Sequence, residues 1–255
     1  DGTLTGIAGS VRLYFLSNVA QTFAGTGTVL TNIGGLSVDN AGLTITHTNQ
    51  IPTLRVNLFS GTITGSAKLT MGTGGTATAT TQIGAAGLLI PAGNYDAIPT
   101  FNLGTGAYNV VYAQESVART TGFEIPSSRL ISALTLSNSN GLTVSGGALS
   151  TGTLTFSALT GGNITTTTAN LLTVTGTATN SIVRTSTTAY VNGPLALTLP
   201  VSLVTGSTYT FPIGKGTLNP FALVNPMTGA TVGGTVTVQA EVFDAATGGT
   251  PGSLM

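Results

Sequence analysis

The most constraining feature of this sequence is an internal duplication. The stretch LSVDNAGLTIT at 36–46 matches LTLSNSNGLTV at 134–144, with one residue inserted in the second copy. The residues that follow recur in the same order, so that the segment from Leu54 matches the segment from Leu154. We therefore place two copies at 36–82 and 134–182, offset by about 100 residues. Self-similarity at a fixed period indicates a stack of similar units.

Strand patterns within each copy return after about 18 to 22 residues, as at Leu134, Leu154 and Leu172. This spacing is typical of one coil of a β-solenoid. A β-sandwich would instead place hairpin partners about 8–12 residues apart, with short Asn-Gly or Asp-Gly turns. The pattern thus favours an all-β fold with a right-handed parallel β-solenoid over residues 1–183. Leu134 and Leu154 are expected to stack in adjacent rungs of an inward ladder, while Thr side chains face water.

The composition of the sequence and the length of its apolar runs change near Ile182. Later runs, at 190–200 and 235–243, are longer and richer in proline and aromatic residues. They predict a separate antiparallel β-sandwich-like module at 184–255. We expect this module to be incomplete, since a sandwich normally needs about seven strands.

Charged residues are very scarce, and this excludes several partners. They make up 5% of the chain, against roughly 25% in an ordinary domain, and seven basic and seven acidic residues give a net charge of zero. Binding to nucleic acid or to anionic membranes is therefore not expected. No apolar run reaches the length of about 18 residues that suggests a membrane span. The absence of cysteine excludes disulfides and thiolate chemistry. The low charge leaves little electrostatic repulsion between copies of the chain to oppose self-association.

Several stretches carry a resemblance to a known family. They are AQTFAGTGT at 20–28, LSVDNAGLTIT at 36–46, IPAGNYDAIPTFNLG at 90–104, TGFEIPSS at 121–128, YVNGPL at 190–195 and FPIGKG at 211–216. Together they resemble the large, repetitive secreted or cell-surface β-solenoid proteins of Bacteroidota, many of them exported by the type 9 secretion system. The resemblance implies an extracellular adhesin, filament or matrix protein and no catalytic residues. Since the chain starts at Asp1 without Met, we expect a processed chain or a fragment.

A polysaccharide-active enzyme on this fold would need carboxylates that converge within about 5–9.5 Å. The chain has seven acidic residues: Asp1, Asp39, Asp96, Glu115, Glu124, Glu241 and Asp244. Only the last two are close in sequence, and Asp39 is expected in a turn beside Asn40. We expect no pair among Asp39, Asp96, Glu115 and Glu124 to converge, and predict no catalytic residue.

The remaining motifs are also weak. His47 is the only histidine and is interpreted as a surface residue in an alternating strand, so no metal site is predicted. Gly214–Thr217 lacks the glycine and the hydroxyl residue that a phosphate-binding loop requires around its lysine. Asn163 begins a formal glycosylation triplet and is assigned no role. The Asp of calcium-binding β-rolls is missing, and no cofactor is expected.

Thr-x-Thr pairs are frequent and raise the alternative of an ice-binding or glycan-binding face. They occur at Thr44/Thr46, Thr62/Thr64, Thr78/Thr80, Thr153/Thr155, Thr165/Thr167 and Thr173 to Thr179. Thr is also a favoured residue for any exposed strand, and the pairs are predicted at different places in the coil.

We therefore expect a non-enzymatic structural component of an extracellular filament, adhesin or surface matrix that associates with itself through backbone edges. An ice-binding or glycan-binding module and a polysaccharide-active β-helix enzyme are the alternatives.

Overall fold

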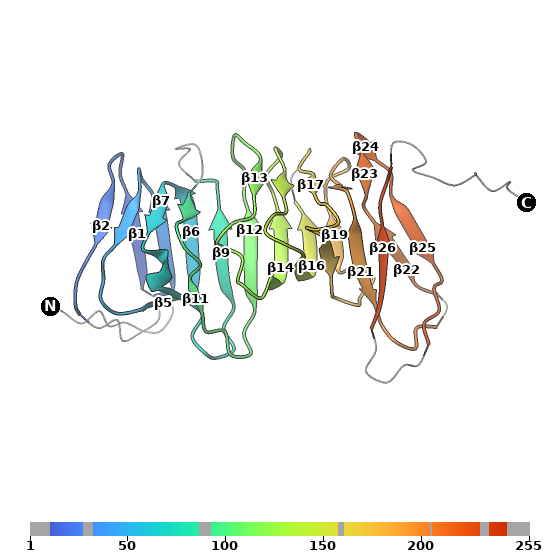
Figure 1. Ribbon diagram of the computed structural model, residues 1–255, viewed down its shortest axis with the longest axis horizontal. Helices are drawn as coiled ribbons and strands as arrows, with labels where there is room; N and C mark the ends of the chain where they lie inside the picture. The colour runs from blue at the N-terminus through green and yellow to red at the C-terminus, as the bar shows by residue number, and fades with distance from the viewer. Residues whose placement is uncertain are drawn as a thin grey trace, which may run out of the picture.

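A computed structural model describes residues 11–27, 33–86, 93–157, 161–204, 206–229 and 235–243. The chain forms an elongated parallel β-solenoid of about seven turns, in which successive coils follow one another from the N-terminal to the C-terminal end (Figure 1). The only helical element in the described residues is the 3-10 turn η1 (Ser66–Lys68). The predicted all-β class and the parallel solenoid are confirmed.

One long sheet runs the length of the molecule. Its parallel strands, in spatial order, are β1 (Arg12–Leu16), β3 (Gly35–Asp39), β6 (Arg55–Ser60), β9 (Ala79–Ile83), β12 (Tyr108–Tyr112), β14 (Leu130–Leu136), β16 (Leu149–Phe156), β18 (Leu172–Val174) and β21 (Leu195–Leu199). A further parallel strand, β19 (Ile182–Arg184), also pairs with β16. The sheet ends on β26 (Val236–Ala240), which is antiparallel to β21.

Three short parallel sheets form the other faces of the coil. The first contains β2 (Gln21–Phe23), β4 (Leu43–Ile45), β7 (Thr62–Thr64) and β10 (Asn94–Tyr95). The second contains β5 (Ile51–Thr53), β8 (Leu69–Met71) and β11 (Thr100–Phe101). The third contains β13 (Arg119–Thr120), β15 (Leu142–Thr143), β17 (Ile164–Thr165) and β20 (Val191–Asn192).

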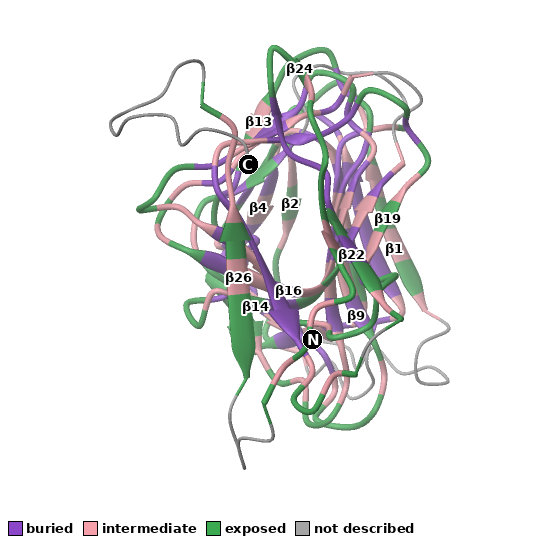
Figure 2. Ribbon diagram, turned by 90° about the vertical axis from the view of Figure 1, so that its right-hand side faces the viewer, coloured by how far each residue is buried: buried purple, intermediate pink, exposed green. Residues whose placement is uncertain are grey.

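The core consists of ladders of inward side chains from the long sheet and from the three short sheets. One ladder runs, rung by rung, through Leu36, Val56, Thr81, Val110, Leu134, Leu154 and Ile182. Alternation of more and less buried residues along strands such as β9, β12 and β18 places every second side chain inside. Figure 2 shows the buried residues on the strands that surround the interior. The predicted stacking of Leu134 on Leu154 is confirmed, and both side chains are fully buried.

One register assignment from the sequence is wrong. Val56 rather than Leu54 occupies the position equivalent to Leu154, since it pairs with Leu36 as Leu154 pairs with Leu134. A shift of two residues keeps the same face inward, so alternation alone cannot detect it. Leu172 stacks on Leu149, because β18 and β19 share the eight-residue strand β16.

The boundary predicted between 183 and 184 lies inside the parallel stack. Both β20 and β21 continue the parallel pairing beyond it. All five residues of β21 are buried, so the long apolar run that suggested a new module is a strand covered on both faces. Antiparallel structure begins after Leu199, with the hairpin of β22 (Thr208–Phe211) and β25 (Phe221–Val224), the hairpin of β23 (Gly214–Lys215) and β24 (Thr217–Leu218), and β26.

Candidate functional site

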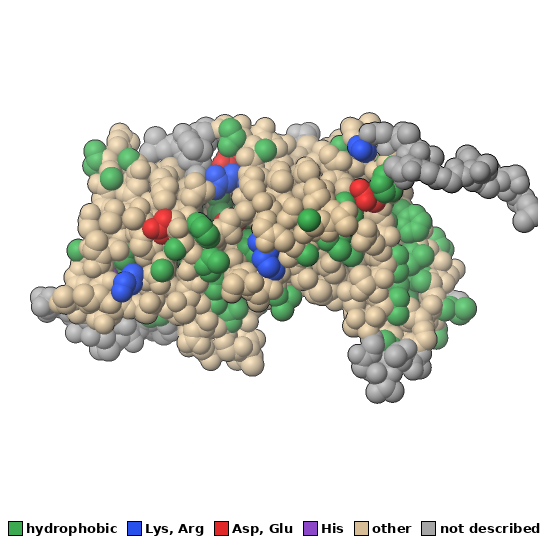
Figure 3. Space-filling model, viewed as in Figure 1, with side chains coloured by type: hydrophobic (Ala, Val, Ile, Leu, Met, Phe, Trp, Pro, Cys, Tyr) green, Lys and Arg blue, Asp and Glu red, His purple; other side chains and the backbone are tan. Residues whose placement is uncertain are grey.

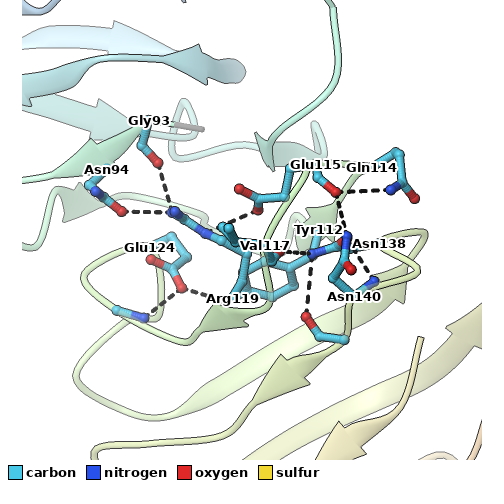
Figure 4. Close-up of polar contacts among 12 residues, drawn as sticks. Gly93, Asn94, Tyr112, Gln114, Glu115, Val117, Arg119, Glu124, Asn138 and Asn140 are labelled. Atoms are coloured by element: carbon cyan, nitrogen blue, oxygen red, sulfur yellow. Dashed lines mark hydrogen bonds and ion pairs between the residues drawn. The ribbon is translucent and has the colours of Figure 1, made fainter. Parts of the chain in front are cut away.

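A group of buried polar side chains lies around the connection between β12 and β14. It combines two of the acidic residues considered above with residues that the sequence did not single out, and its members are Thr81, Tyr95, Tyr108, Tyr112, Glu115, Arg119 and Glu124. We call this set the tyrosine–carboxylate cluster. Glu115 and Glu124 both lie in this part of the molecule, and each has a partner of its own, Arg119 for Glu115 and Tyr112 for Glu124 (Figure 4).

Thr81 is the polar residue of the inward ladder, and the hydroxyls of two tyrosines form hydrogen bonds with its hydroxyl. Its hydroxyl lies 3.1 Å from the Tyr95 hydroxyl and 2.9 Å from the Tyr108 hydroxyl. The Tyr108 hydroxyl also donates to the backbone carbonyl of Glu124 at 2.7 Å. These bonds join two successive coils inside the core, where an unpaired hydroxyl would be costly.

The Glu124 carboxylate lies inside the coil and has two donors. One is the Tyr112 hydroxyl, and the other is the Gly122 amide at 2.6 Å. Glu124 is only 4% exposed, so these bonds replace its contact with water. Burial, reinforced by the nearby Glu124 carboxylate, raises the pKa of Tyr112 well above its usual value. Burial likewise raises the pKa of Tyr95 and Tyr108, so all three phenols stay protonated and able to donate.

Glu115 and Arg119 form a buried ion pair, with 3.2 Å between Arg119 Nε and Glu115 Oε1. Arg119 Nη2 also donates to the Gly93 carbonyl at 2.9 Å and to Asn94 Oδ1 at 2.6 Å (Figure 4). The Glu115 side chain is 2% exposed and that of Arg119 11%. The pair therefore links β13 to the preceding coil and has little contact with solvent.

Other charged side chains also bind backbone groups of neighbouring segments. Arg129 Nη2 donates to the carbonyls of Ser145 and Gly147, and its partial burial lowers its pKa. Asp39 Oδ1 accepts from the Ser60 hydroxyl at 3.0 Å. Asp39 is the last residue of β3, and it is Asn40 that makes the expected turn, by accepting from the Gly42 amide.

The Asp96 carboxylate has three hydrogen-bond donors around it. Its carboxylate accepts from the Gly65 amide at 2.8 Å, the Ser66 amide at 3.0 Å and the Ser66 hydroxyl at 2.6 Å. Burial acts to raise the pKa of Asp96, but the hydrogen bonds from Ser66 and Gly65 outweigh it and hold that pKa below its usual value. Asp96 thus fastens its coil to the preceding one.

His47 is not a surface residue, contrary to the sequence interpretation. It is 5% exposed, stacks on Phe23 with 5.5 Å between the ring centroids, and accepts from the Asn49 amide at Nδ1. The alternation that places Leu43 and Ile45 inside continues to position 47. Strand parity could therefore have placed the ring inside the coil.

The remaining sequence motifs have structural roles. Gly214–Lys215 and Thr217–Leu218 form a tight hairpin with Gly216 at φ 70°, rather than a phosphate-binding loop. Asn163 Oδ1 accepts from the Tyr190 amide of the next coil. Asp1 and Asp244 lie outside the described residues, and Glu241 follows β26 directly.

Threonine hydroxyls form two outward ladders on the short sheets. One comprises Thr22, Thr44 and Thr64, and the other Thr120, Thr143 and Thr165, continued by Asn192. Neighbouring strands place these side chains about 4.8 Å apart. Thr153 and Thr155 lie instead on the long sheet, so the Thr-x-Thr pairs are divided between faces.

Within the described ranges, no group of three or more His, Cys, Asp or Glu side chains could hold a metal ion. The same residues contain no helix long and apolar enough to cross a membrane. Searches with protein-family models, curated proteins and solved structures found no match to the chain.

Proposed function

We propose that this chain is a non-enzymatic structural component of an extracellular filament, adhesin or surface matrix, and that it associates with itself through exposed backbone edges. The observation that carries the proposal is the continuous parallel stack from β1 to β21. A solenoid of this kind is a rod whose length grows with each coil.

The use of the charged side chains supports this role. Asp96, Arg119, Glu124 and Arg129 each bind groups of the backbone or of neighbouring segments. In a protein with so little charge, these contacts reinforce the fold within a coil, as at Glu124, and between coils, as at Asp96 and Arg119. Such an arrangement suits a shaft that has to resist unwinding.

The ends of the stack support self-association. In the described part of the chain, no strand pairs with the outer edge of β1 or with the outer edge of β26. Open strand edges expose N–H and C=O groups that can pair with another chain. The sequence resemblance to secreted and surface proteins supports the extracellular setting.

Sedimentation and negative-stain images of the purified 255-residue chain test the proposal. We expect fibres or concentration-dependent polymers at micromolar protein that persist in about 1 M salt, where the screening length is roughly 3 Å. A stable monomer would contradict self-association. Antibody labelling of intact producing cells tests the location, and a signal only after cell lysis would contradict it.

The outward threonine ladders favour an ice-binding or glycan-binding face as a second candidate. Thr120, Thr143 and Thr165 repeat one hydroxyl and one methyl per coil on a parallel sheet. Thermal hysteresis by the native chain that is lost in Thr143→Tyr would support ice binding. Its absence in the native chain would remove that candidate.

A further inference from the structure

The N-terminal end of the stack presents an incompletely buried apolar layer. Leu13 and Phe15 on β1 and Phe23 on β2 pack against the core but are only partly buried. Leu13 and Phe15 stack directly over Leu36 and Val38 of the next coil. This layer therefore continues the inward ladders up to an open strand edge.

The C-terminal end presents a second apolar layer of the same kind. On β26, Val236, Val238 and Ala240 lie opposite Leu199, Leu197 and Leu195, and so continue the inward ladders. Val238 and Ala240 are partly buried and Val236 is 37% exposed.

The β22–β25 hairpin adds to this layer. Phe221 pairs with the buried Phe211 and is itself 44% exposed. Figure 3 shows hydrophobic side chains gathered at this end of the molecule. None of β22, β25 and β26 contains a charged residue.

The strand directions allow the two ends to join. All strands from β1 to β21 are parallel, and β26 is antiparallel to β21. A second copy stacked in the same orientation would present a β1 that runs antiparallel to β26. The two open edges then satisfy each other in an ordinary antiparallel ladder.

One register of β1 against β26 also places two opposite charges across from each other. In an antiparallel pair, residues directly opposite each other share a face. If Leu13 lies opposite Ala240, Phe15 lies opposite Val238, and both pairs face the core. The same register places Arg12 opposite Glu241, the residue that follows β26, on the outer face. Moving β1 by two residues along β26 separates these charges.

We propose that β1 of one copy pairs with β26 of the next in this register, so that identical copies join head to tail. This pairing rests on the self-association proposed above and identifies the two strand edges that make the contact. The contact is heterologous, since a different surface is used on each copy. Such a contact extends into an open filament unless the rotation between copies closes a ring. The occupant of each end is therefore a second copy of this chain.

Cysteine cross-linking tests the joint directly, because the chain has no cysteine of its own. The proposed register places Tyr14 opposite Gln239 on the outer face, and both side chains are exposed. Opposite residues of an antiparallel pair have Cα atoms about 4.5–5.5 Å apart, within disulfide range. We expect the double variant Tyr14→Cys/Gln239→Cys to give a covalent ladder on a non-reducing gel after mild oxidation.

The matched control is Tyr14→Cys/Thr237→Cys, because Thr237 is the next residue on the same face of β26. Its diagonal separation from Tyr14 is about 7–8 Å, too far for a disulfide. Polymers that cross-link only through Thr237, or through neither site, would overturn the joint but leave self-association intact. A chain that stays monomeric would overturn both proposals.

Charge reversal gives an independent readout. Arg12→Glu or Glu241→Arg alone should raise the protein concentration needed for assembly about fivefold, since like charges directly opposite are destabilising. The double reversal should restore the native threshold. A double variant no better than the single variants would contradict the Arg12–Glu241 pairing.

Discussion

Replacing Tyr112 by Phe should destabilise the protein through the carboxylate that its hydroxyl supports. Glu124 is 4% exposed and has two donors, the Tyr112 hydroxyl and the Gly122 amide. The substitution keeps the ring and removes one of these two donors. A hydrogen bond to a charged group contributes about 1.5–3 kcal/mol. We therefore expect a loss of about 2 kcal/mol in the free energy of unfolding.

The matched control is Tyr95→Phe. The Tyr95 hydroxyl is bonded to the neutral Thr81 hydroxyl, which keeps its bond to Tyr108 in the variant. A neutral bond of this kind contributes about 0.5–1.5 kcal/mol. Each variant removes the hydroxyl oxygen of a buried tyrosine in the same core, and the two differ in the charge of the hydrogen-bond partner.

Urea unfolding followed by circular dichroism measures the difference. With an m-value of about 3 kcal/mol/M, a loss of 2 kcal/mol lowers the midpoint by about 0.7 M. A double-mutant cycle with Glu124→Gln should give a coupling energy of about 1 kcal/mol or more between the two positions. A coupling near zero, or a Tyr95→Phe variant as unstable as Tyr112→Phe, would refute the reasoning.

Three further predictions concern the coil contacts. Asp96→Asn should lower stability at pH 7. Because the pKa of Asp96 is lowered in the folded state, its contribution is present above the unfolded pKa of about 4 and is lost as the pH falls through the folded value. The difference from the native chain should therefore shrink in acid, and a difference independent of pH would contradict this. Gly61→Ala should lower the temperature of thermal unfolding strongly, because Gly61 has φ 71° and an added Cβ would lie 2.4 Å from the Asn40 carbonyl oxygen. The control is Gly75→Ala, where an added Cβ would have only the Thr73 side chain near it and should change that temperature little. Leu154→Ala should cost about 2–5 kcal/mol in chemical unfolding. Thr155→Ala on the outer face should change little, and equal losses would contradict the assigned faces.

Local sequence patterns were sufficient to predict the class of fold. Alternation of Leu and Thr determines which face of a strand is buried, and the return of this pattern after about one coil length indicates parallel stacking. These signals correctly paired Leu134 with Leu154. The same alternation, carried on from Leu43 and Ile45, also predicts that His47 faces inward.

Only the tertiary structure decided the register of Leu54 and Leu172 and the composition of the tyrosine–carboxylate cluster. The two-residue shift at Leu54 conserves the face of every side chain, so no local pattern detects it. Leu172 stacks on Leu149 rather than on Leu154 because β16 is long enough to pair with both β18 and β19. Glu124 lies in the connection after β13 and accepts from Tyr112, the last residue of β12, which is twelve residues earlier in the chain. The sequence thus determined which residues face inward, since that depends on backbone geometry within one strand. Which inward residues meet depends on the lengths of the connections and on close packing between coils, and these are properties of the whole stack.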